Sequence, residues 1–80
     1  MFAYMQTPLT ATQRAASVIR AELARRRIPQ SAVAELLNIS QASVSRRLSG
    51  EIPWDVNEID AVAKLIGVPA AIFVNQDGAA

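Results

Sequence analysis

Residues 30–50 read QSAVAELLNISQASVSRRLSG, and this stretch holds two short helical patterns with a turn between them. The first pattern places Val33, Ala34 and Leu37 on one face, which predicts a helix from residue 30 or 31 to Leu37. Ala34 is small enough to let a second helix approach. Asn38 follows at the position where a left-handed residue ends a helix, and asparagine is the best residue after glycine for a positive φ.

The second pattern predicts a helix that starts at Gln41 and stops at Gly50, with the Ser40 hydroxyl as its N-terminal cap. Only Val44 and Leu48 are apolar in it, and they lie one turn apart. Two helices this short, joined this closely, cannot pack antiparallel over a useful length, so we expect them to cross steeply. This is the geometry of a helix-turn-helix, whose second helix enters the major groove of DNA.

A longer helix is predicted before this pair. Thr10 and Gln13 match a capping box at its start, and Pro29 closes it at the other end. Three consecutive arginines, residues 25–27, lie at the end where cations complement the helix dipole. Its apolar residues recur at helical spacing and are expected in the core: Ala15, Ala16, Ile19 and Leu23.

Two further helices are predicted after the pair. Asp55 and Glu58 match a second capping box, and Gly67 ends the helix that they start. Pro69 can open a last, short helix. Trp54 is expected to anchor the preceding loop in the core. The inward residues of the longer helix are Ile59, Val62, Ala63 and Ile66.

These patterns predict an all-α fold, a compact bundle of four helices plus a short fifth. A chain of 80 residues has room for one domain. We expect a flexible N-terminal arm over residues 1–9, the helix-turn-helix domain over residues 10–74 and a frayed tail over residues 75–80.

The composition argues against catalysis and against metal binding. The sequence has no cysteine and no histidine, so it lacks a thiolate metal site and the usual catalytic bases and nucleophiles. The acidic residues between positions 51 and 60 fit helix caps and solvation better than an acid–base pair, and they lack the spacing of a calcium loop. We therefore predict no enzyme, cofactor, metal site or small-molecule ligand.

Charge is distributed unevenly along the chain. Residues 1–47 carry seven arginines and two glutamates, a net of +5, while residues 48–80 carry one lysine and five acidic residues, a net of −4. One face is therefore expected to be basic and to meet a polyanion. No apolar run approaches the ~20 residues of a membrane span. We expect no membrane partner and a cytoplasmic location.

The predicted helix over residues 41–49 has an outward face suited to DNA. At about 100° per residue, Val44 and Leu48 point inward, and no carboxylate lies on the opposite face to repel phosphate. Glutamine can pair with adenine, arginine with guanine, and an alanine methyl can pack on that of thymine. The residues on or beside this face are Gln41, Ala42, Ser43, Ser45, Arg46 and Ser49.

Residues 30–50 also resemble the helix-turn-helix of the phage repressor and Cro superfamily (lambda-repressor-like, XRE superfamily). The similarity continues through a following helix that ends in LIGV and a short PAAIF helix, so it covers residues 10–74. The stretches SGEIPW and DVNEIDAVAKLIGV are similar to small regulators of actinobacteria and their phages. The family usually has glycine where this chain has Asn38, which tolerates the same backbone conformation.

The resemblance implies roles for individual residues. The base-reading positions correspond to Gln41, Ala42, Ser45 and Arg46. Positions at phosphates or near the DNA backbone correspond to Gln30, Ser43, Arg47 and Asn57, and Gln30 also braces Gln41. The C-terminal region, with Ile72, Phe73 and Val74, corresponds to a region that often forms a homodimer contact. We add Ser31, Ser49 and Arg27 as candidate phosphate contacts.

Some interpretations have competing alternatives. Arg27 and its two preceding arginines can serve the helix dipole or a phosphate equally well. Residues 72–74 can close the core as well as form a dimer contact. Arg14 and Arg20 are interpreted as ordinary surface residues.

The function predicted from these features is a sequence-specific regulator that binds a double-stranded DNA operator. It is expected to be a phage or prophage repressor or Cro-like protein that blocks a promoter with the helix over residues 41–49. One alternative is an excisionase-like or antitoxin protein, and another is a protein-interaction module on the same fold, similar to an antirepressor.

Overall fold

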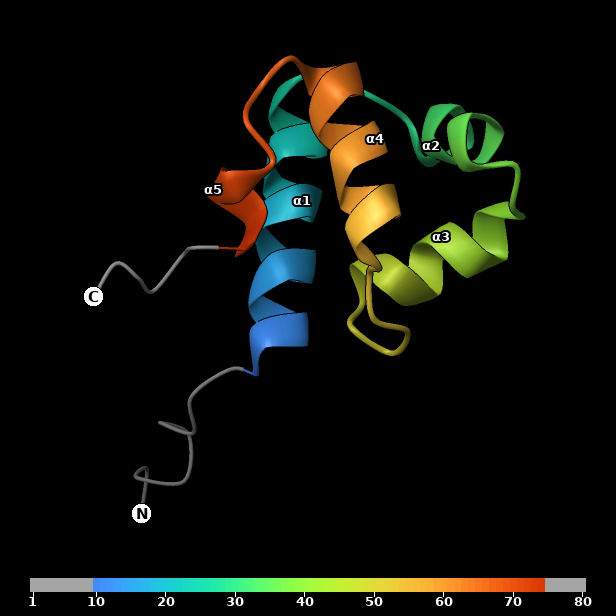
Figure 1. The fold of residues 1–80 in the computed structure, drawn as a ribbon. Helices are drawn as coiled ribbons and strands as arrows, with labels where there is room; N and C mark the ends of the chain where they lie inside the picture. Colours follow the sequence, from blue (N-terminus) through green and yellow to red (C-terminus); the bar gives the residue numbers. More distant parts are fainter. Residues whose placement is uncertain (1–9, 75–80) are drawn as a thin grey trace.

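The structure, a computed structural model, describes residues 10–74, which form the five helices of an all-α fold (Figure 1). The helices are α1 (Ala11–Arg25), α2 (Gln30–Leu37), α3 (Gln41–Leu48), α4 (Val56–Ile66) and α5 (Ala71–Val74). The predicted fold class, four helices plus a short fifth, is confirmed. The predicted arm over residues 1–9 and tail over residues 75–80 lie outside the described residues.

Both predicted capping boxes are present. The Thr10 hydroxyl accepts a hydrogen bond from the Gln13 amide at 3.1 Å, and the Gln13 side-chain oxygen accepts from the Thr10 amide at 2.9 Å. At the start of α4, Asp55 Oδ1 accepts from the Glu58 amide at 2.8 Å, and Glu58 Oε1 accepts from the Asp55 amide at 3.1 Å. These reciprocal bonds satisfy N–H groups that the helices leave unpaired, so they fix where α1 and α4 begin.

Each of the four longer helices ends beside a residue with a positive φ. The next residue then donates its amide hydrogen to a carbonyl five positions earlier, as Ile28 does to Leu23 at 2.9 Å. At three of the four ends this next residue is apolar and packs on the core (Ile28, Ile39 and Val68). The positive-φ residues are Arg27 (57°), Asn38 (58°), Gly50 (88°) and Gly67 (89°). The predicted left-handed conformation of Asn38 is confirmed. Arg27 adopts the same conformation although it is neither glycine nor asparagine.

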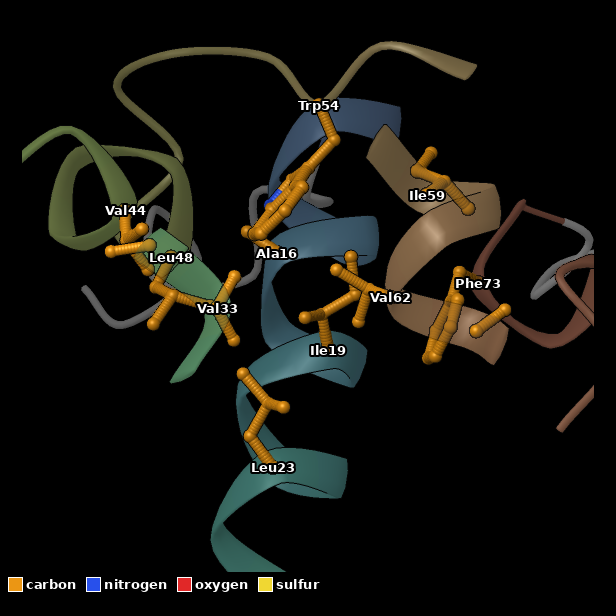
Figure 2. Close-up of a cluster of buried hydrophobic side chains, with 12 residues drawn as sticks. Ala16, Ile19, Leu23, Val33, Val44, Leu48, Trp54, Ile59, Val62 and Phe73 are labelled. Carbon is orange, nitrogen blue, oxygen red and sulfur yellow. The ribbon is translucent and has the colours of Figure 1, made fainter. Parts of the chain in front are cut away.

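The core lies where α1, α2, α3 and α4 converge. Helix α1 packs against α3 and α5, and α2 packs against α3 and α4. Figure 2 shows Ile19 of α1 beside Val62 of α4, with Val33 and Val44 gathered where α2 meets α3. The inward residues predicted for α1 and α4 are buried except Ile66, which is half-buried against the core.

Two aromatic side chains complete this core. Trp54 is 8% exposed, which confirms its predicted role as an anchor for the loop before α4. Phe73 is 1% exposed and belongs to the same cluster. It therefore closes the core, which is one of the two roles considered for residues 72–74, and a dimer contact of this region stays a prediction.

Candidate nucleic-acid interface

Helices α2 and α3 form a helix-turn-helix. Three residues, 38–40, connect them. In Figure 1 α2 is seen nearly end-on while α3 lies across the view, so the two helices cross steeply as predicted. Val33 and Val44 are both 0% exposed at this crossing, and Ala34 beside them is 7% exposed. The small alanine and the left-handed Asn38 allow the close approach and the sharp turn.

The outward face of α3 is exposed and carries no acidic side chain. The Ser40 hydroxyl caps the helix by accepting a hydrogen bond from the Ser43 amide at 3.0 Å. Val44 and Leu48 are buried, which orients the helix. The exposed residues are those predicted on the outer face, namely Gln41, Ala42, Ser45, Arg46 and Ser49. Their exposure is confirmed, and their contacts with bases stay a prediction.

Donors from elsewhere in the fold hold the C-terminal end of α3. Arg20 of α1 donates from Nη1 to the Leu48 carbonyl at 2.7 Å, and the Trp54 indole donates from Nε1 to the Arg47 carbonyl at 3.0 Å. The last carbonyls of a helix lack partners within it, so these bonds satisfy them and fix the helix direction. Arg20 thus has a structural role, contrary to its interpretation as an ordinary surface residue. Sequence spacing carries no signal for a bond between residues 28 apart.

Arg47 is held at the flank of α3 that faces α4. Its Nε and Nη2 donate to the two carboxylate oxygens of Glu58, each at 3.1 Å. Its Nη1 donates to the Ser43 carbonyl at 3.2 Å and also to the Ser43 hydroxyl. The two side chains of the ion pair are only 14% and 16% exposed. Arg47, predicted near the DNA backbone, is therefore engaged within the protein.

The arginines at the end of α1 divide into two kinds. Glu22, whose side chain is 11% exposed, accepts hydrogen bonds from Arg25 at 2.7 Å and from Arg26. Arg27 is exposed and makes no ion pair within residues 10–74. The neighbouring start of α2 has no side-chain cap. Exposed Gln30 and Ser31 therefore lie at a helix N-terminus whose N–H groups can meet a phosphate, and Arg27 lies beside them.

A second exposed surface is apolar and lies between α4 and α5. Val56 is 80% exposed and Val74 is 55% exposed. Both line an open hollow of about 440 Å³, together with Ala71 and the exposed Asn57. Of the three residues predicted as a dimer contact, Val74 is exposed here, and Ile72 is half-buried against the core. Helical spacing gave no sign that Val56 is exposed, because Val56 shares the face of the buried Ile59. It is exposed because it lies one turn beyond the edge of the core.

Within residues 10–74, no helix is long and apolar enough to cross a membrane. The same residues contain no group of three acidic side chains placed to hold a metal ion.

The fold and the exposed face of α3 define a small all-helical domain with a helix-turn-helix, the class of domain that regulators use to bind DNA. The chain belongs to the BetR domain family, which matches residues 9–80. This match fits a helical DNA-binding domain and indicates a regulatory role. No curated protein and no solved structure matches the chain.

Proposed function

We propose that this protein is a sequence-specific transcriptional regulator of the phage repressor and Cro type, which binds a double-stranded operator with α3 and blocks a promoter. The observation that carries the proposal is the exposed, acid-free face of α3 on a helix fixed at both ends. Small and uncharged side chains allow close approach to base edges. A helix held by Ser40, Arg20 and Trp54 presents them in one orientation.

Base reading is assigned mainly to Arg46 and Gln41, with Ser45 and Ala42 in support. Arginine can make a bidentate contact to guanine, and glutamine to adenine. Phosphate contacts fix the register, and we assign them to exposed or half-exposed polar groups of the helix-turn-helix and of the segments before and after it: Gln30, Ser31, Ser43, Ser49, Asn57 and Arg27. Exposed Arg27 is the strongest candidate among them because it carries a charge and its two neighbours are paired with Glu22.

A second copy of the chain is the proposed occupant of the apolar surface around Val56 and Val74. Many helix-turn-helix proteins bind as dimers to half-sites about one helical turn apart, and dimerisation compensates for few contacts per subunit. A net charge of only +1 makes such compensation useful here. We propose further that the protein acts in a bacterial cytoplasm, without catalysis and without a cofactor.

A selection from random duplexes tests this function. Full-length protein is incubated with a randomised library, bound duplexes are amplified, and the enriched sequences are read for a motif and its symmetry. A palindrome with half-sites about one helical turn apart is the expected result for a dimer, and a single asymmetric site indicates a monomer. Binding without any enriched motif contradicts sequence-specific regulation.

A protein-interaction module is the second candidate, because Val56 and Val74 are exposed side chains of the kind that partners cover. It is favoured if the protein binds no duplex even at low ionic strength, where counterion release makes binding strongest.

A further inference from the structure

The pair formed by Arg47 and Glu58 has a consequence for DNA binding that rests on the proposed function. Arg46 and Arg47 are the two cations of α3. Arg46 points outward and is exposed, whereas Arg47 is half-buried. The positive charge that α3 presents to a phosphate backbone therefore depends on whether Glu58 neutralises Arg47.

We propose that Glu58 is an affinity-limiting residue, which keeps Arg47 from acting as a phosphate contact and so lowers binding to DNA of any sequence. All three nitrogen atoms of the Arg47 guanidinium donate within the protein: Nε and Nη2 to the carboxylate, and Nη1 to Ser43. Of its five N–H groups, only the second one on Nη2 is left for another acceptor. A phosphate that is to be held bidentately would have to displace a carboxylate that is itself largely buried.

Displacing that carboxylate is unfavourable. A charge left unpaired in a largely buried position is strongly destabilising, whereas an intact pair with good geometry is tolerated. Glu58 is further fixed by the Asp55 amide, which donates to Oε1 at 3.1 Å, so it cannot swing away without breaking the capping box of α4. The pair is thus expected to persist when α3 meets DNA.

The effect on specificity follows from the nature of phosphate contacts. Contacts to phosphates strengthen operator and random DNA alike, and binding to random DNA is almost entirely of this kind. By neutralising one arginine of α3, Glu58 lowers binding to the many competing sites. Discrimination then depends more on the base contacts of the outward face.

Glu58→Gln is the direct test, and Glu51→Gln is its matched control. The glutamine keeps an oxygen that can accept from the Asp55 amide, but its NH₂ group replaces the oxygen that Arg47 Nη2 donates to. Glu51 is an exposed residue of the loop after α3, and its substitution changes net charge by the same amount. The probe is a random-sequence duplex, titrated by fluorescence anisotropy at several salt concentrations, with circular dichroism as a check of folding.

The expected result is tighter binding by Glu58→Gln than by Glu51→Gln. The slope of log K against log salt should be steeper for Glu58→Gln than for Glu51→Gln by about 0.9, the contribution of one added phosphate contact. In the double variant Arg47→Met/Glu58→Gln, the salt dependence should return to the wild-type value. A salt dependence equal to that of Glu51→Gln, or weaker binding, overturns the inference.

The double variant Arg47→Met/Glu58→Gln, compared directly with the wild type, gives a second test that does not require a folded Glu58→Gln protein, because it leaves no buried charge unpaired. Because Arg47 is not a phosphate contact in the wild type under this proposal, its loss should leave the salt dependence unchanged. A salt dependence flatter by about 0.9 shows that Arg47 contacts a phosphate and overturns the inference. If the wild type binds no duplex at low salt, the proposed DNA-binding function is wrong. If it binds but the salt dependence does not behave as expected, only the proposed role of Glu58 is wrong.

Discussion

The two sides of α3 are built in opposite ways. On the inward side and at the C-terminal end, Val44 and Leu48 are buried and the last carbonyls accept hydrogen bonds from Arg20 and Trp54. On the outward side, Gln41, Ala42, Ser45, Arg46 and Ser49 are exposed. The Arg46 side chain makes no hydrogen bond or ion pair within residues 10–74. Stability is therefore expected to depend on the first side and DNA binding on the second, with little overlap.

Trp54→Ala should have the largest effect on the inward side of α3, as a loss of folding stability. It removes a large buried ring and leaves the Arg47 carbonyl without its indole donor. Loss of a buried tryptophan costs on the order of 3–5 kcal/mol, which approaches the total stability of a small domain. Thermal unfolding followed by circular dichroism should show a protein that is largely unfolded at room temperature.

Trp54→Phe separates packing from hydrogen bonding in the same position. Phenylalanine keeps most of the ring but has no N–H group, so the Arg47 carbonyl loses its indole donor and retains backbone donors such as the Gly50 amide at 3.3 Å. A loss of about 1–2 kcal/mol is expected. A fully stable Trp54→Ala protein would contradict the role of this residue as an anchor.

Arg46→Ala should impair DNA binding by the outward side of α3 without changing the stability that the inward side provides. Its side chain has no partner in the described part of the chain, so the free energy of unfolding should change little. Affinity for the selected operator should fall by about 1–3 kcal/mol, with discrimination lost at one base pair. Both quantities are measured on one preparation, by thermal unfolding and by titration of operator and random duplexes. Equal losses on the two duplexes would contradict base reading by Arg46.

The inward side was largely predictable from the sequence because its signals are local. Helix spacing identified Val44 and Leu48, and single residues marked the caps and turns, as Ser40 and Asn38 show. The exposed residues of α3 followed from the same spacing. What local patterns cannot supply is a partner distant in the chain, and the bonds of Arg20 and Arg47 are of that kind. Such bonds depend on how whole helices dock, which spacing does not encode.

Phe73 illustrates a second limit. An apolar residue near the end of a chain has the same pattern whether it closes the core or joins a dimer. The packing of α5 on α1 shows which of these residues belong to the core, because it buries Phe73 while leaving Val74 exposed.

Ser40→Ala should weaken the N-terminal end of α3, where the two sides meet. It removes the hydroxyl that accepts from the Ser43 amide, a loss of about 1 kcal/mol for a typical cap. Ser45→Ala is the matched control, because it removes a hydroxyl from the exposed face of the same helix and should leave stability within about 0.5 kcal/mol of wild type. Urea unfolding of the two variants measures the difference. Equal stability of the two would show that the cap contributes nothing.

Arg27→Gly should change stability no more than Ser40→Ala does, and with the opposite sign. Arg27 adopts φ 57°, in the left-handed region that costs an ordinary residue about 1–2 kcal/mol. Glycine removes this cost but loses about 0.5–1 kcal/mol of backbone entropy on folding, so a net gain of about 0.5–1 kcal/mol is expected in urea unfolding.

The same substitution should weaken DNA binding, which would explain why a strained arginine occupies this turn. Arg27→Gly is expected to lower affinity for all duplexes alike and to flatten the salt dependence by about 0.9. Asn38→Gly relieves a similar backbone conformation (φ 58°) without removing a charge, so it should leave the salt dependence unchanged. If Arg27→Gly gains stability and keeps the wild-type salt dependence, Arg27 serves the end of α1 alone and is not a phosphate contact.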